Sequence, residues 1–224
     1  MKSKLLLLLI FGSTISFSQQ IEFGVFGGYD FNNIVNTKIK DGRAVIGNAY
    51  WDMSLGGIIT YYFKSPDDNR GKGRLSLLYK NVTKGSKSEV YNNSKYEYDS
   101  NLFGLLFGIG APIGNNFTLY ADTGLGYTIL DSENIYKGNE DELGAFPKVE
   151  DYLVSKGSEI NFLFDMGLEK IVVKDKLKLF LEMNTNPAII KFNESDGKYQ
   201  NQGIGFSLGV KYFINLKKEE DYDY

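Results

Sequence analysis

The stretch Glu159-Ile-Asn-Phe-Leu-Phe-Asp-Met-Gly-Leu-Glu169 alternates between two kinds of side chain. One set is apolar and comprises Ile160, Phe162, Phe164, Met166 and Leu168, and the other includes Asn161, Asp165, Gly167 and Glu169. Successive side chains of a β-strand point to opposite faces. The alternation therefore predicts a strand with one apolar face and one polar face.

The same alternation recurs along the chain and predicts eight strands. Their approximate ranges are 21–31, 50–63, 73–82, 96–110, 117–130, 159–172, 177–186 and 202–214. Each has ten residues or more, which is enough to cross a bilayer when the strand is tilted. We therefore predict an all-β fold, an eight-stranded antiparallel up-and-down transmembrane β-barrel whose apolar face points to lipid and whose polar face points inward.

The lengths of the predicted connections alternate. The short ones are 64–71, 111–116 and 173–176, and the long ones are 32–49, 83–95, 131–158 and 187–201. Up-and-down order places the short turns and both termini at one end, as in outer-membrane barrels. Pro66 and Pro112 fall in short turns and Pro147 and Pro187 in long loops, so no proline is expected within a strand.

The first residues predict export. Lys2 and Lys4 precede an apolar run at 5–11, and Ser16-Phe17-Ser18 offers small residues at the two positions that a signal peptidase reads. The run is too short to span a bilayer as a helix, which needs about 20 residues. We predict a cleaved signal peptide at 1–18, a barrel domain at 19–214 and a polar periplasmic tail at 215–224.

The chain resembles the small eight-stranded, porin-like outer-membrane β-barrel family of Bacteroidetes-type bacteria. The resemblance rests on Ser16-Phe-Ser-Gln-Gln20, Phe23-Gly-Val-Phe-Gly-Gly-Tyr29, Leu102-Phe-Gly-Leu-Leu-Phe-Gly-Ile-Gly110 and Gly203-Ile-Gly-Phe-Ser-Leu-Gly-Val-Lys-Tyr-Phe213. It implies location in the cell outer membrane and no particular activity. It also implies an aromatic residue at the end of the last strand, which would be Phe213.

The interior of an eight-stranded barrel is just wide enough for side chains. The inward charges expected here are Glu22, Asp52, Asp122, Asp165, Glu169 and Glu182 with Arg74, Lys80, Lys178 and Lys211. Buried charges must pair or cost several kcal/mol each. We predict a polar network that plugs the lumen, with Arg74, Asp122, Asp165 and Glu182 at its middle.

Composition excludes several kinds of chemistry. The chain has no His and no Cys, so it can build neither a His-dependent nucleophile system nor a zinc site of His and Cys. No catalytic residues, cofactor or metal site are predicted, and we expect no enzyme. A net charge of −3 without a basic stripe argues against nucleic acid as a partner.

The predicted partners are outer-membrane lipid and, through the long loop 131–158, surface or envelope proteins. Aromatic residues near strand ends fit the girdles of a membrane barrel. They include Tyr50, Trp51, Tyr61, Tyr62, Phe63, Tyr96, Tyr98, Tyr127, Tyr212 and Phe213. The main prediction is a structural or surface-interaction role. The alternatives are a narrow porin or transporter of small solutes and a soluble periplasmic barrel that binds a lipophilic ligand.

Overall fold

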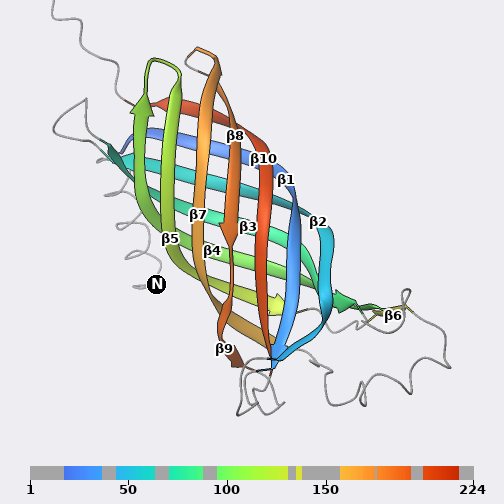
Figure 1. Ribbon diagram of the computed structural model, residues 1–224. Helices are drawn as coiled ribbons and strands as arrows, with labels where there is room; N and C mark the ends of the chain where they lie inside the picture. The colour runs from blue at the N-terminus through green and yellow to red at the C-terminus, as the bar shows by residue number, and fades with distance from the viewer. Residues whose placement is uncertain are drawn as a thin grey trace, which may run out of the picture.

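The computed structural model describes residues 18–36, 44–63, 71–87, 95–130, 135–137, 157–174, 176–192 and 199–216. All regular structure in these ranges is β (Figure 1). The strands are β1 (Ser18–Asn36), β2 (Ala44–Phe63), β3 (Lys72–Lys87), β4 (Lys95–Ile113), β5 (Phe117–Leu130), β6 (Ile135–Lys137), β7 (Gly157–Val173), β8 (Leu177–Thr185), β9 (Ala188–Phe192) and β10 (Tyr199–Asn215). No helix in the described part of the chain is long and apolar enough to cross a membrane.

Eight of the strands close into an antiparallel barrel in which each pairs with its neighbour along the chain, and β1 pairs with β10. A row of cross-strand partners leaves β1 at Ile21 and returns to it at Phe31. The row passes through Tyr61, Leu75, Phe107, Thr123, Phe164, Thr185 and Ile204. The stagger is therefore ten residues (31 − 21 = 10) for eight strands. Strands of such a barrel tilt by about 40° from its axis. The predicted all-β fold, an eight-stranded antiparallel up-and-down barrel, is confirmed.

The two strands beyond these eight are short. β6 lies within the predicted loop 131–158 and pairs with Lys95–Glu97 of β4. β9 follows β8 after Asn186-Pro187 and pairs with β7. Both lie at the end of the barrel opposite the β4–β5 and β7–β8 turns (Figure 1).

The prediction that no proline lies within a strand is wrong at Pro112, which is the last residue but one of β4 and the cross-strand partner of Thr118 on β5. Pro187 lies outside the strands, between β8 and β9, but still contacts the sheet. The Phe162 N–H donates a 3.0 Å hydrogen bond to the Pro187 carbonyl, and Asn161 on β7 is the cross-strand partner of Ala188. Pro187 therefore continues the ladder with β7 through its carbonyl. The ladder loses only the hydrogen bond that an N–H at this position would donate. A sheet tolerates a proline at such a place because the pairing of β7 with β9 is irregular there.

Several strands extend further toward the loop end than the alternation indicated. β1 reaches Asn36, β2 begins at Ala44 and β3 reaches Lys87. The added residues mix polar and apolar side chains without regular alternation, so they lack a two-faced pattern. Backbone hydrogen bonds between neighbouring strands continue regardless of side chain, because every residue except proline carries one donor and one acceptor.

The outer surface of the barrel is apolar and the inner surface is charged, which reverses the arrangement of a soluble protein. Val25 and Leu208 are 68% and 62% exposed, whereas Glu22 and Lys211 are fully buried. Inside the barrel, one layer of apolar side chains fills the middle of the lumen. It comprises Phe26, Ile58, Leu78, Leu102, Leu106, Leu163 and Phe180.

The expected aromatic girdle is partly wrong. Tyr50, Tyr62 and Phe213 are only 5%, 3% and 4% exposed and lie in the lumen. Neighbouring residues on a strand point to opposite faces, so Tyr212 takes the outward-facing place at the barrel's end and Phe213 cannot. Three other predicted members are exposed on the outside: Trp51, Tyr127 and Tyr212. The side chains of Tyr96 and Tyr98 lie outside the described residues.

Inward glycines make room for large side chains from the next strand. A Cβ atom built at Gly56 would overlap the Phe26 ring, and one at Gly209 would overlap the Phe180 ring. The two rings meet edge to face, with centroids 6.2 Å apart. A strand glycine commonly marks such a close approach. The narrow lumen is thus packed by pairing large residues with residues that have no side chain.

Gly56→Ala should destabilise the barrel, whereas Gly57→Ala should be nearly neutral. A Cβ at Gly56 would also lie 2.5 Å from the Tyr79 carbonyl oxygen, but one at Gly57 meets only the Gly24 oxygen at 3.5 Å. Overpacking of this kind costs roughly 1–3 kcal/mol. Urea unfolding in detergent micelles measures the difference, and equal free energies of unfolding for the two variants would contradict this packing.

Candidate functional site in the barrel lumen

The lumen contains an unusually large set of buried charges. Among the described residues there are seven buried carboxylates and five buried cations. They are Glu22, Asp30, Asp122, Glu159, Asp165, Glu169 and Glu182 with Arg74, Lys80, Lys84, Lys178 and Lys211. Three of the five cations come from β3, and three of the seven carboxylates come from β7. The alternation within each strand places them all on the inner face.

Glu169 is the centre of the cluster nearest the short turns. Lys211 Nζ donates to its Oε1 over 2.5 Å, and Arg74 Nη1 approaches the same oxygen at 3.4 Å. Lys178 Nζ and the Tyr62 hydroxyl donate to Oε2 over 3.2 and 3.1 Å. Donors from four strands thus reach this carboxylate. A buried charge needs such ion pairs and hydrogen bonds to offset its loss of hydration.

Glu22 on β1 extends this cluster. Lys178 donates to Glu22 Oε1, and Lys211 Nζ lies 3.6 Å from its Oε2. Lys178 and Lys211 therefore each contact both carboxylates of the cluster, Glu22 and Glu169. Such a network tolerates burial better than isolated pairs do, because each charge has more than one partner.

Ion pairs also cross the lumen from β3 to β7, which are separated by β4 and β5 in the sheet. Arg74 reaches Glu169 near one end, and Lys84 Nζ lies 3.1 Å from Glu159 Oε2 near the other. Between them, Lys80 Nζ donates to Asp30 Oδ1 over 2.6 Å and to Asn184 Oδ1 over 2.9 Å. These contacts connect strands on opposite sides of the barrel and occupy the space through which a solute would pass.

The structure buries all four residues that were predicted for the middle of the network. Arg74 Nε lies 3.1 Å from Asp122 Oδ2, and the Arg74 guanidinium lies 3.9 Å from the centre of the Tyr120 ring. Glu182 accepts a 2.7 Å hydrogen bond from the Tyr120 hydroxyl. Asp165 is the cross-strand partner of Asp122, but no ion pair joins it to a cation in the described ranges.

The sequence interpretation missed part of this site. The expected inward set lacked Asp30, Lys84 and Glu159. Asp30 could have been included, because it lies an even number of residues from Glu22 on β1 and so points to the same face. Lys84 lies beyond the predicted end of its strand. The Tyr62 and Tyr120 hydroxyls were not expected as donors. The half-buried Asp52 was expected inside, and it faces Asp30 across the β1–β2 ladder.

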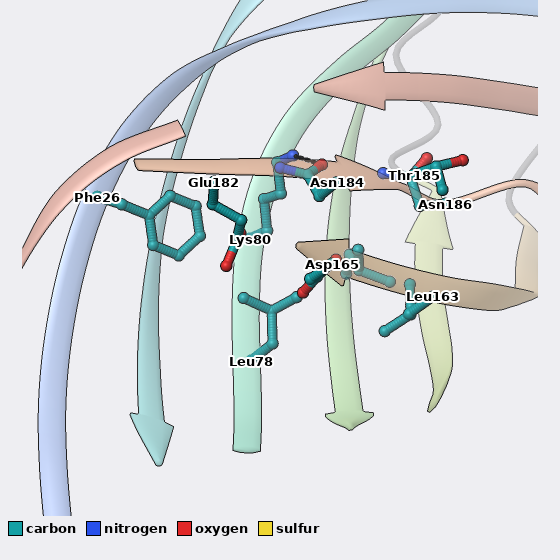
Figure 2. A pocket seen from close by; sticks show the side chains of 10 residues that line it. Phe26, Leu78, Lys80, Leu163, Asp165, Glu182, Asn184, Thr185 and Asn186 are labelled. Carbon is teal, nitrogen blue, oxygen red and sulfur yellow. Dashed lines mark hydrogen bonds between the residues drawn. The ribbon is translucent and has the colours of Figure 1, made fainter. Parts of the chain in front are cut away.

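A cavity of about 10 Å³ remains in the middle of the lumen (Figure 2). Apolar side chains of the central layer, including Phe26, Leu78 and Leu163, form part of its wall. Lys80, Asp165, Glu182 and Asn184 form much of the rest. A volume of this size holds about one water molecule. Among the described residues, no three acidic side chains come together in a group that could hold a metal ion.

Comparison with known proteins finds structural similarity without close sequence similarity. No protein-family model matches the chain, and no curated protein matches it. Among solved structures, Ail, the attachment invasion locus protein of Yersinia pestis, is 12% identical with a TM-score of 0.44, covering 87% of this chain and 99% of Ail. The N-terminal β-barrel domain of Pseudomonas aeruginosa OprF is 12% identical with a TM-score of 0.46, covering 88% of this chain and 99% of that domain. The outer-membrane protein OprG of Pseudomonas aeruginosa is 12% identical with a TM-score of 0.45, covering 87% of this chain and 96% of OprG.

Glu169→Gln should lower the free energy of unfolding by about 3 kcal/mol or more, because it leaves buried cations short of a counter-charge. Asp99→Asn is the matched control. Asp99 is an exposed carboxylate that accepts a hydrogen bond from Thr83 on the outer wall. Its loss should change stability by about 0.5 kcal/mol or less. If both variants unfold like the wild type, the Glu169 cluster does not stabilise the barrel.

Proposed function

We propose that the chain is an integral outer-membrane β-barrel protein with a structural or surface-interaction role through its long loops, and that it belongs with the small porin-like barrels of Bacteroidetes-type bacteria that it resembles. The proposed export route is the predicted signal peptide at 1–18. The single observation that carries the proposal is the continuous exposed apolar surface around a closed barrel with a charged interior.

Closure and strand length support a membrane location. Within hydrocarbon every backbone N–H and C=O needs a partner, and a closed barrel provides one for each strand edge. A tilted membrane strand needs about 9–11 residues. β1 to β5 have 14 to 20 residues, and β7 and β10 have 17 each. β8 has nine residues, and β9 continues along the same partner strand, β7.

The outward aromatic residues support the same location. The Phe31 and Trp51 rings on β1 and β2 lie 4.9 Å apart, and the Tyr79 and Phe103 rings on β3 and β4 lie 5.3 Å apart. Aromatic residues gather where the apolar band of a membrane barrel meets the headgroups.

The two alternatives fit the structure less well. A soluble barrel that carries a lipophilic ligand needs an apolar interior and a polar exterior, the reverse of what the barrel has. A narrow porin needs a continuous passage. Here, ion pairs and an apolar layer cross the lumen, and the central cavity has room for about one water molecule. We therefore do not favour transport.

Trp51 offers a direct test of the membrane location, because it is the chain's only tryptophan and is 53% exposed on the outer face. Lipids brominated on their acyl chains should quench its fluorescence strongly when the protein is folded into vesicles. Trp51→Phe with Phe26→Trp, which moves the tryptophan to a buried lumen position, should be quenched much less. Equal quenching of both proteins, or none for the native protein, would overturn the membrane proposal.

The predicted loop 131–158, which the start of β7 at Gly157 shortens to 131–156, is the proposed contact surface. Leu130 and Gly157, which flank it, are cross-strand partners, so a rigid sheet holds both ends of this connection. β6 and β9 add strands beside its base. Long loops on a rigid scaffold often carry binding. The residues of the loop other than β6 lie outside the described residues, and a surface or envelope protein partner remains a proposal.

An epitope tag inserted between Gly144 and Ala145 should be labelled by antibody on intact cells. The same tag inserted between Asp67 and Asp68, in the predicted short connection 64–71, should be labelled only after the outer membrane is permeabilised. Replacing residues 138–156 with a short glycine-serine linker should reduce adherence between cells, measured by sedimentation of a suspension. Labelling of both tags in intact cells would reject the orientation, and unchanged adherence would reject this loop as the contact.

A further inference from the structure

The buried charges of the lumen do not balance, and the imbalance has a definite position. Arg74, Lys178 and Lys211 are matched by Glu22, Asp122 and Glu169, Lys80 is matched by Asp30, and Lys84 is matched by Glu159. Two carboxylates, Asp165 and Glu182, are left with no ion pair to a cation in the described part of the barrel.

Asp165 and Glu182 line the same central cavity (Figure 2). They come from neighbouring strands, β7 and β8, and point into the space beside Phe26 and Leu78. Asp165 is 2% exposed, and its Oδ2 has no hydrogen-bond partner among the described residues. Glu182 has one donor, the Tyr120 hydroxyl at 2.7 Å.

Two buried carboxylates without a counter-charge are costly, because burial removes hydration that nothing replaces. The cavity beside them is about 10 Å³, which suits a single ion of the size of a water molecule and nothing larger. Asn186, which also lines it, carries an amide oxygen, whereas the Asn184 Oδ1 already accepts a hydrogen bond from Lys80. We propose that this cavity binds one alkali cation, Na⁺ or K⁺, through Asp165 and Glu182.

The chemistry of the wall favours a singly charged ion. Ca²⁺ takes six to eight oxygen ligands and Mg²⁺ needs near-octahedral geometry. The cavity has two carboxylates, and no metal site of three acidic groups occurs in the described residues. Lys80 also lines the cavity, but its ammonium is bound to Asp30 over 2.6 Å and to Asn184 over 2.9 Å. The apolar layer beside the cavity limits hydration, so the ion would rely on the protein oxygens.

The test is thermal unfolding of the full chain folded in detergent, at fixed pH and ionic strength, in NaCl, KCl or choline chloride. Choline is too large for the cavity. An ion that binds only the folded state raises Tm with concentration, and the rise in at least one alkali salt should be about 3–5 °C over choline. Equal Tm in all three salts would overturn the cation site and leave protonation of the carboxylates as the means of neutralisation.

Asp165→Asn should abolish the dependence on the alkali ion, and Glu182→Gln provides a second variant if the first does not fold. The exposed Asp99→Asn control should keep the full dependence. Loss of the dependence in Asp99→Asn, or its survival in both lumen variants, would show an effect of bulk salt and reject the site. The measurement is made in detergent and does not depend on cellular location, so its failure would leave the outer-membrane proposal intact.

Discussion

Closure of the sheet after eight strands with a stagger of ten residues is the constraint on which the rest of this structure depends. Strand number and stagger together fix the tilt and the radius of a barrel, and at eight strands the interior is only wide enough for side chains. The same closure removes every strand edge, which is the condition for placing β-structure in lipid. The outer surface can therefore be apolar, and the inner surface must be filled from within.

The filling uses two devices that suit a narrow tube. Large side chains pack over glycines of the adjacent strand, as Phe26 does over Gly56 and Phe180 over Gly209. Charged side chains reach across the tube, where Arg74 and Lys84 on β3 meet Glu169 and Glu159 on β7. Buried ion pairs add little net stability compared with apolar packing, but removing one partner is costly. The ion pairs across the lumen therefore determine which strands face each other more than they add to the stability of the fold.

Alternation and turn chemistry were enough to predict the eight barrel strands and the inward or outward direction of most residues. The sequence could not predict contacts that depend on the stagger. Glu169 meets side chains from β2, β3, β8 and β10, and no periodicity within one strand shows that these residues lie at one level. Tyr62 and Phe213 were assigned to the girdle because of their residue type, although the parity of their strands already placed them inside. Pro112 was placed in a turn because it lacks a donor, although it lies in β4 opposite Thr118.

Charged side chains are concentrated on the inner surface of the barrel, where they affect its stability but cannot take part in recognising a partner. Ten of the twelve buried charged side chains of the described strands are neutralised by one another inside the barrel, where they cannot bind an outside partner. The outer wall offers lipid-compatible apolar surface and few polar groups, which hydrogen-bond among themselves, as Tyr79 and Asn81 do with Asn101. A specific partner needs polar groups at defined positions to fix its orientation, in addition to apolar area. The described strands offer few such groups on their outer face. Under the proposed surface-interaction role, the long connections are where a difference in sequence would change what the protein binds, while the barrel beneath them need only remain closed and filled.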